Sequence, residues 1–374
     1  MNEHHRYWTP NSETGFISPN ALACFSELPG CWQWAKDLSS SVGNLSDHEL
    51  LHRLNDCPVV SINDLSDLDI SEQEFLLRFF AILACHRIHR PAFKNERFLP
   101  KSVSVPLWHL SQLAGRPPGL TYASYVLCNF KDFPGPNSSP DVFKIQSTPT
   151  GTPDEEWFVA VHLAVESYGG IVVQSIKNIE QALNELDFAQ MAHALNSIAQ
   201  AICTSRDELS KVRDRMAPEV FRNRIRPLLH GFENLLFEGV PEPNVLSYVG
   251  ETGAQSGIIR AVDAVLVPEH SPSVSRHQQA FLQCAPPAHR EFIKTASGLG
   301  ARLSQSQAHS RLVSEARNHA IHELREFRRS HLKVVTEFLV RDGKQLATKG
   351  TGGTPLNSWL DQLIKETESS NSGK

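Results

Sequence analysis

The chain has 374 residues, which is enough for about two domains at ~150 residues each. Hydrophobic residues make up 40% and charged residues 21%, and 36 Lys+Arg against 41 Asp+Glu give a net charge of −5. This balance is that of an ordinary globular protein and excludes a disordered chain, a collagen and a coiled-coil rod. Net acidity also argues against sequence-independent binding of nucleic acid or anionic membranes.

No targeting or redox signal stands out along the chain. The longest apolar runs, 157–165 and 261–268, are shorter than the ~18 residues that a membrane span needs. Residues 1–8 lack the apolar core of a secretory signal. Seven scattered cysteines without a Cys-x-x-Cys pair predict neither a disulfide framework nor a zinc knuckle. We therefore expect a cytoplasmic protein with no nucleic-acid and no membrane partner.

Helix signals dominate from the first hundred residues onward. The segments 46–49 and 71–74 read Ser-x-x-Glu, the pattern of a capping box at a helix start. Five prolines with interspersed Gly and Ser between 131 and 153 predict a loop. We therefore expect a small N-terminal domain over residues 1–133, a linker loop over 134–153 and a large helical domain over 154–374.

The large domain reads as helical almost throughout. Thr-Pro-Asp-Glu at 152–155 predicts a helix start, with proline at the first helical position. Helical periodicity recurs over 155–178, 181–208, 217–236, 255–266, 276–296, 308–341 and 355–367, with almost no period-two alternation. These patterns predict an all-α fold whose N-terminal domain is also mainly helical, and a disordered polar end over 366–374.

The most informative histidine lies in the helix predicted over 310–340. At ~100° per residue, His331 shares one face with apolar residues such as Leu324, Phe327 and Val334. It is therefore either a core histidine bonded to a backbone carbonyl or the axial ligand of a haem iron. Arg328, one turn earlier, either pairs with an acidic group beside that ligand or extends into solvent.

A second histidine lies in a helix that is apolar all round. Residues 157–165 should be buried on every side, so His162 has no access to solvent. A buried unpaired polar group costs ~1–3 kcal/mol, so this imidazole must find a partner or take part in chemistry. Two buried histidines on separate helices indicate one enclosed site.

Two further segments indicate ligand contacts. Pro227 follows Arg226 within a helical pattern and should open the helix there. The Arg226 guanidinium next to Phe221 would suit a bidentate substrate carboxylate, whereas the other basic residues over 211–224 read as a solvated face. Gly-Thr-Gly-Gly-Thr at 350–354 predicts a flexible loop, which is either a linker or a mobile lid.

Taken together, six segments resemble the indoleamine 2,3-dioxygenase family of haem proteins, over about residues 98–367. They are Phe-Leu-Pro at 98–100, Pro-Pro-Gly-Leu-Thr-Tyr-Ala-Ser-Tyr-Val-Leu at 117–127, Gly-Glu-Thr-Gly-Ala-Gln-Ser at 250–256, Pro-Pro-Ala-His-Arg at 286–290, Phe-Arg-Arg-Ser-His-Leu at 327–332 and the loop at 350–354. The resemblance implies haem b between the small domain and a large helical haem-binding domain.

The resemblance also implies roles residue by residue. His331 matches the proximal iron ligand, Arg328 the arginine near a haem propionate, and Asp263 an acid that supports this arginine. Thr252 and Gly253 belong to a segment that lines the haem. The positions that match the substrate pocket are the wall residues Phe158, Phe221 and Tyr122, the carboxylate-binding Arg226, and Thr351 in the lid.

Two positions depart from the animal members of the family. His162 stands where they have a serine, and the related tryptophan 2,3-dioxygenases use a distal histidine. We therefore expect His162 to be a catalytic residue that accepts a hydrogen bond from an indole N–H or donates one to oxygen. Tyr125 stands where animal members often have a smaller residue, which predicts a narrower pocket.

The function implied is oxidative cleavage of the indole C2–C3 bond of L-tryptophan, or a related indoleamine, by O2 to give N-formylkynurenine. This tryptophan catabolism through the kynurenine pathway also needs an electron donor that keeps the iron ferrous. Three alternatives stay open: mono-oxygenation or rearrangement of a substituted indole, a non-catalytic haem or oxygen binder, and a helical scaffold without a cofactor.

Overall fold

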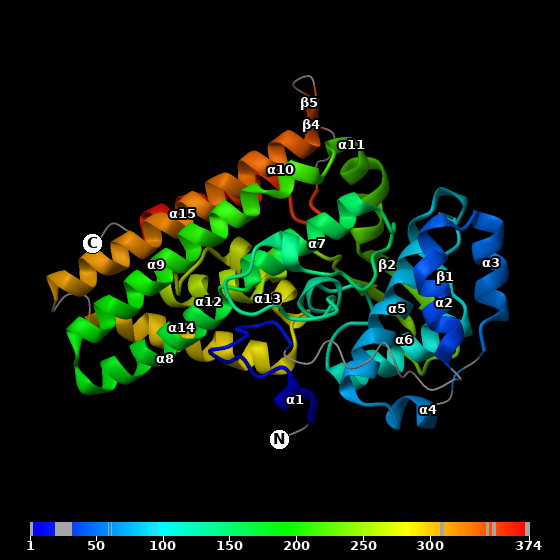
Figure 1. Ribbon diagram of the computed structural model, residues 1–374, viewed down its shortest axis with the longest axis horizontal. Helices are drawn as coiled ribbons and strands as arrows, with labels where there is room; N and C mark the ends of the chain where they lie inside the picture. The colour runs from blue at the N-terminus through cyan, green and yellow to red at the C-terminus, as the bar shows by residue number, and fades with distance from the viewer. Residues whose placement is uncertain are drawn as a thin grey trace.

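The structure is a computed structural model that describes residues 3–18, 32–58, 60, 62–93, 95–306, 310–341, 344–345 and 349–370. Within them α-helices dominate, as predicted (Figure 1). They are α1 (Glu3–Tyr7), α2 (Gln33–Ser41), α3 (Asp47–Asp56), α4 (Ile62–Ser66), α5 (Ile70–His89), α6 (Lys101–Ala114), α7 (Pro153–Glu166), α8 (Gly169–Glu185), α9 (Phe188–Ser210), α10 (Val212–Arg215), α11 (Pro218–Val220), α12 (Gly257–Leu266), α13 (Pro272–Gln283), α14 (Pro287–Ser306), α15 (Arg311–Leu339) and α16 (Leu356–Ser369).

Short 3-10 or π-helical turns and strands complete the fold. The turns are η2 (Val42–Asn44), η3 (Pro91–Phe93), η4 (Ala123–Leu127), η5 (Pro140–Val142), η6 (Phe221–Ile225), η7 (Arg226–Leu229) and η8 (Gly253–Gln255). The strands β1 (Phe98–Leu99), β2 (Phe232–Phe237) and β3 (Val245–Tyr248) form a small sheet in that order, parallel and then antiparallel. A hairpin of β4 (Val340–Arg341) and β5 (Lys344–Gln345) projects from the end of α15.

Most of the predicted helix starts are confirmed by their caps. Ser46 and Glu49 form a complete capping box at α3, and the Thr152 side chain accepts a hydrogen bond from Glu155 N at α7. The prediction at 71–74 is wrong by two residues. Asp69 caps α5 instead, because its carboxylate accepts from Glu72 N at 2.8 Å while Glu72 accepts from Asp69 N at 2.8 Å.

Four of the predicted helices are broken in the structure. The stretch 155–178 divides into α7 and α8, 181–208 divides into the end of α8 and α9, and 276–296 divides into α13 and α14. The stretch 217–236 becomes α11, the π-turn η6, the 3-10 turn η7 and the strand β2. Pro227 removes a helical donor, and a Cβ on Gly231 would lie 2.1 Å from Tyr248 O, so this glycine lets β2 and β3 meet.

The predicted division at 133 and 154 stays a prediction. One cluster of buried apolar residues runs from α5 and α6 into α7, with Leu83, Leu107 and Val161 among its members. In addition, β1 from the first predicted domain pairs with β2 from the last. These contacts connect helices α2–α6 with the rest of the helical fold (Figure 1).

The helix that carries His331 is anchored by a second core. The apolar face of α15 packs along α9, with Ala320, Leu324 and Phe327 in one cluster with Leu195 and Ile202. A window of 18 residues within 153–185, covering α7 and α8, is apolar enough to cross a membrane. That window is 83% buried inside the protein, and core helices meet the same criterion.

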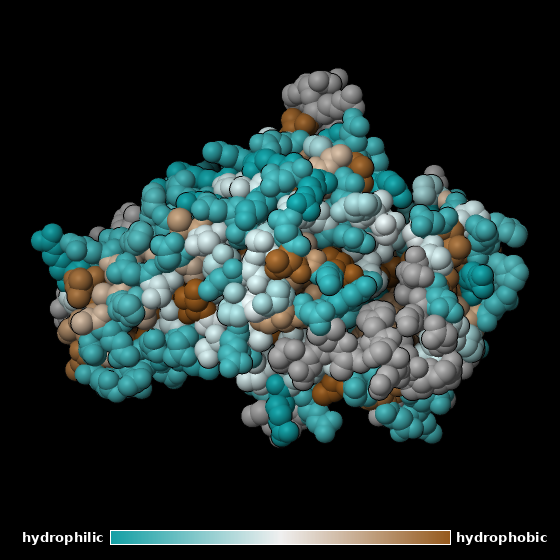
Figure 2. All heavy atoms as spheres, viewed as in Figure 1, coloured by the Kyte–Doolittle hydropathy of each residue, from teal (hydrophilic) through white to brown (hydrophobic). Residues whose placement is uncertain are grey.

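The surface is mainly hydrophilic on the face shown in Figure 2, where apolar side chains gather only in small groups. The prediction of a disordered end is wrong as far as Ser369, because α16 runs to that residue and Thr367 is fully buried. Residues 371–374 lie outside the described residues. The contacts of α16 bear directly on the site below.

Candidate active site

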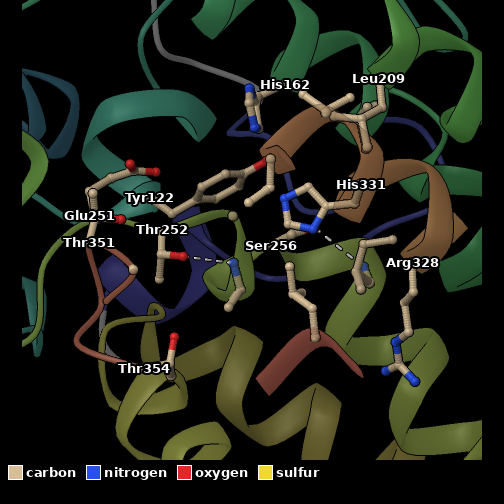
Figure 3. A pocket seen from close by; sticks show the side chains of 18 of the residues that line it. Tyr122, His162, Leu209, Glu251, Thr252, Ser256, Arg328, His331, Thr351 and Thr354 are labelled. Carbon is tan, nitrogen blue, oxygen red and sulfur yellow. Dashed lines mark hydrogen bonds between the residues drawn. The ribbon is translucent and has the colours of Figure 1, made fainter. Parts of the chain in front are cut away.

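A cavity of about 220 Å³ lies among α7, η6, η7, α12, α15, α16 and the segments 250–256 and 350–354. Every predicted site residue except Tyr125 lines it. These residues are Tyr122, Phe158, His162, Phe221, Arg226, Thr252, Gly253, Asp263, Arg328, His331 and Thr351. Figure 3 labels six of them, Tyr122, His162, Thr252, Arg328, His331 and Thr351. The fold therefore brings together residues from six separate parts of the sequence.

His331 projects from α15 into this cavity (Figure 3). Neither of its ring nitrogens has a hydrogen-bond partner among the described residues, so the expected bond of a core histidine to a backbone carbonyl is absent there. Burial lowers the pKa of His331 to about 4, and His162 contributes to this shift. The imidazole is therefore neutral near pH 7, the form that binds a metal.

His162 also faces the cavity but is held by its own helix. Its Nδ1 lies 2.8 Å from Phe158 O, and because a carbonyl only accepts, Nδ1 carries the proton. Burial lowers the pKa of His162, so the ring is neutral and Nε2 keeps a free lone pair. A Cβ on Gly253 would lie 3.9 Å from this Nε2, which places the acceptor beside the 250–256 segment.

Arg226 begins η7, immediately after the π-turn that holds Phe221. Its guanidinium donates to His230 Nε2 at 3.1 Å and to Lys349 O, and no carboxylate pairs with it within the described residues. Burial lowers the pKa of Arg226. The ring of Phe221 lies 5.6 Å from that of Phe158, so an apolar wall and an uncompensated cation line the same cavity.

Arg328 lies one turn before His331 and is paired, as predicted, with an acid. It donates to Asp263 Oδ1, to Thr367 Oγ1 and to Leu363 O. Burial alone would raise the pKa of Asp263, but Arg328 and His270 outweigh it and hold this pKa well below its usual range. The carboxylate thus stays ionised at one end of the cavity.

Comparison with known proteins identifies the family. Residues 5–370 match the family described as indoleamine 2,3-dioxygenase. The chain belongs to the indoleamine 2,3-dioxygenase family. It is 26% identical over 396 residues to indoleamine 2,3-dioxygenase 1 of Mus musculus, which covers 98% of this chain and 95% of that protein.

Other relatives carry two kinds of name. The chain is 26% identical over 367 residues to indoleamine 2,3-dioxygenase of Saccharomyces cerevisiae, covering 82% of this chain and 81% of that protein. It is also 29% identical over 285 residues to a myoglobin of Haliotis madaka, covering 72% of this chain and 74% of that protein. The resemblance drawn from the six segments is therefore confirmed at the level of the family.

Indoleamine 2,3-dioxygenases are haem-dependent, and the cavity of this member fits a haem. His331 offers a neutral imidazole that no described residue hydrogen-bonds, and Phe327, Val334 and Leu209 line the cavity with apolar side chains. Within the described residues, no three His, Cys, Asp or Glu side chains gather as a metal-ion set. A single axial histidine therefore suits this cavity, and haem iron is the metal that such a ligand holds.

The segments 250–256 and 350–354 line the cavity through close backbone contacts. Thr252 Oγ1 accepts a hydrogen bond from Ala254 N at 3.4 Å and so caps η8. A Cβ on Gly250 would lie 2.5 Å from Thr351 O, so only glycine lets these two segments pass so closely. Gly350 N donates to Thr354 O at 2.7 Å, which closes the 350–354 loop on itself. Its role as a lid stays a prediction.

The expectation that Tyr125 narrows the pocket is wrong. Its side chain is fully buried behind the cavity wall, and its hydroxyl donates to Glu155 Oε1 at 2.8 Å. The centre of the Tyr125 ring lies 6.3 Å from the centre of the ring of Phe158, which is a residue of the cavity wall. The buried acid on α7 draws the hydroxyl away from the cavity.

Sequence reasoning missed two features of the site. Ser256 donates to Glu166, which also accepts from Ile258 N at 3.3 Å and so fastens the 250–256 segment to the end of α7. Burial raises the pKa of Glu166 to about 7. The second feature is Arg260, which lines the cavity from α12. A lone arginine within the otherwise apolar run 257–262 was the available signal.

Proposed function

We propose that this protein cleaves the indole C2–C3 bond of L-tryptophan, or of a related indoleamine, with O2 to give N-formylkynurenine. Family membership supports a haem-dependent dioxygenase. The observation that carries the choice of substrate is Arg226, a partly buried guanidinium that no described carboxylate pairs with, next to the neighbouring rings of Phe158 and Phe221. An indole with an amino-acid carboxylate complements both.

Each cavity residue then has a task on the substrate. Haem held by His331 would supply the iron chemistry that activates O2. Arg226 binds the substrate carboxylate in two parallel hydrogen bonds, and the two phenylalanine rings hold the indole, so that the ring is presented in one orientation. His162 accepts the indole N–H through Nε2. The 350–354 loop, linked to Arg226 through Lys349 O, excludes water when it closes.

The proposal extends to the cellular setting. It includes an electron donor that keeps the iron ferrous, because the ferric form does not activate O2 in this reaction class. It also includes a cytoplasmic location and the absence of nucleic-acid and membrane partners, which follow from charge and composition.

The decisive experiment follows absorbance and product mass together. Holoprotein is reduced without oxygen and then given O2 and L-tryptophan, and a product with two added oxygen atoms supports cleavage. A product with one added oxygen would instead show mono-oxygenation. Arg226→Gln should raise KM for L-tryptophan by about tenfold or more, since a charged hydrogen bond is worth ~1.5–3 kcal/mol. Arg224→Gln, which changes an exposed arginine of the preceding turn η6, is the matched control.

A second candidate is haem and oxygen binding without turnover. The relatives named myoglobin favour it. Under this alternative L-tryptophan is recovered unchanged, and it leaves the haem spectrum unaltered in both wild type and Arg226→Ala. A spectral change on adding tryptophan that Arg226→Ala abolishes argues for the enzyme.

A further inference from the structure

The end of the cavity beside Asp263 holds more positive than negative charge. Arg260 and Arg328 both face the Asp263 carboxylate, and both line the cavity. His270 bridges Asp263 Oδ2 at 2.9 Å and Glu366 Oε2 at 2.6 Å, so that both of its nitrogens donate. Three cations thus meet two carboxylates, and among the described residues one positive charge is left without a partner.

The hydrogen bonds show which cation is left over. The Arg328 guanidinium donates hydrogen bonds to Asp263, Thr367 and the Leu363 carbonyl, and the last two of these belong to α16. Arg260 approaches Asp263 Oδ2 only to 3.8 Å, and its Nε has no hydrogen-bond partner among the described residues. Asp263 Oδ2 already accepts from His270 and from Gln278 Nε2 at 2.8 Å, which occupies this oxygen.

Arg260 is also largely buried. Its N–H donors that lack an acceptor therefore destabilise the folded protein. Its side chain is 14% exposed, and burial lowers its pKa, an effect that Asp263 offsets and Arg328 reinforces. An anion that enters this end of the cavity would supply the missing acceptor and balance the charge. Much of the cavity wall is apolar, with Phe327, Val334 and Leu209 among its residues, so the fitting ligand has an apolar body that ends in a carboxylate.

We propose that Arg260 is the direct hydrogen-bond donor to a haem propionate, whereas Arg328, held by Asp263, Thr367 and Leu363, is a positioning residue that fixes the charge behind it. This rests on the haem binding in the proposed function but not on the choice of substrate. It assigns to α12, and not only to α15, the recognition of the polar edge of the cofactor.

The test compares haem b with haem dimethyl ester, which lacks the propionate charge, by following transfer of each from the holoprotein to apomyoglobin. In wild type the ester should dissociate faster. Haem b should dissociate from Arg260→Gln about 10- to 100-fold faster than from wild type. The ester should dissociate from this variant at nearly the same rate as haem b. The haem reduction potential should fall as well, because a cation beside the propionate is lost.

Two variants frame the result. Arg276→Gln removes an exposed positive charge from α13 and should match wild type. Arg260→Lys keeps a charge and a donor and should retain most of the haem b affinity, which also covers the case in which Arg260→Gln does not fold. Equal dissociation of haem b from wild type, Arg260→Gln and Arg276→Gln would overturn the inference. If wild type does not turn over tryptophan but still releases the haem ester faster than haem b, the proposed function is overturned and the role of Arg260 is not.

Discussion

The two imidazoles of the cavity differ in a single hydrogen bond. His162 Nδ1 donates to the carbonyl of Phe158, four residues earlier in α7. This bond fixes the proton on Nδ1 and directs an unprotonated Nε2 into the cavity. His331 has no such bond among the described residues, so its ring keeps a lone pair for a metal. Two chemically identical side chains thus become an acceptor and a ligand.

The acceptor role of His162 is testable with a substrate that lacks the indole N–H. Wild type should favour L-tryptophan over 1-methyl-L-tryptophan, and His162→Leu should reduce that preference in KM by about two- to tenfold, because a neutral hydrogen bond contributes ~0.5–1.5 kcal/mol. His162→Gln retains an acceptor and serves as the control. An unchanged ratio of KM values in His162→Leu would contradict the assignment.

Tyr125 should matter for stability and not for substrate binding. Tyr125→Phe removes the hydrogen bond to Glu155, which still accepts from Thr150 N and Thr150 Oγ1 at 2.6 Å. We expect a loss of about 1 kcal/mol in the free energy of unfolding, measured with urea, and no change in KM for L-tryptophan. Tyr248→Phe, whose hydroxyl has no hydrogen bond within the described residues, should cost less. A raised KM in Tyr125→Phe would restore it to the pocket wall.

At the scale of elements, α16 closes the cavity and anchors its charged end. Trp359, Leu360 and Leu363 form one apolar cluster with Phe281 of α13. The last turns of α16 supply Thr367 to Arg328 and Glu366 to His270. A polar chain end is therefore ordered because its side chains complete a buried network.

The His270 bridge makes this docking depend on pH. Burial opposes its protonation, but Asp263 and Glu366 raise the pKa of His270 above its usual 6.5, although Arg328 opposes them. Its contribution to stability is therefore full below about pH 6.5 and is lost as the pH rises through the folded pKa. The difference in unfolding free energy between wild type and His270→Gln, measured with urea on haem-free protein from about pH 5 to 9, should shrink as the pH rises. A difference that stays constant would contradict this linkage.

At the scale of the whole molecule, the cavity joins parts of the chain that lie far apart in sequence. Its walls come from α7, η6, η7, α12, α15 and α16 (Figure 3). A cofactor bound there contacts elements that otherwise pack in separate apolar clusters. Haem binding should therefore stabilise the whole fold, since only the folded chain assembles the site.

The haem ligand can be tested through that stabilisation. Haem should raise Tm in thermal unfolding, by the equivalent of about 2.7 kcal/mol when free haem is roughly 100-fold above its dissociation constant. His331→Ala should abolish both this shift and the haem absorbance. His319→Ala, an exposed histidine on the same helix, should retain both. Unchanged haem content in His331→Ala would refute the assignment of the ligand.

The sequence by itself determined the features that depend on neighbours a few residues away. The helix starts at Ser46 and Thr152 follow from caps within one turn, and the broken helix around Arg226 follows from Pro227. The inward direction of His331 follows from helical spacing alone. The six motif segments were enough to indicate the family.

Only the tertiary structure decided the features that depend on distant partners. Tyr125 lies behind the wall because Glu155 accepts a hydrogen bond from its hydroxyl. The last turns of α16 are ordered because Thr367 and Glu366 accept hydrogen bonds from Arg328 and His270. The sheet exists because β1 (Phe98–Leu99) meets β2 (Phe232–Phe237), which lies far away along the chain. No local sequence pattern predicts which buried donor lacks an acceptor. Only the three-dimensional arrangement of the charges around Asp263 shows that no described residue accepts a hydrogen bond from Arg260 Nε.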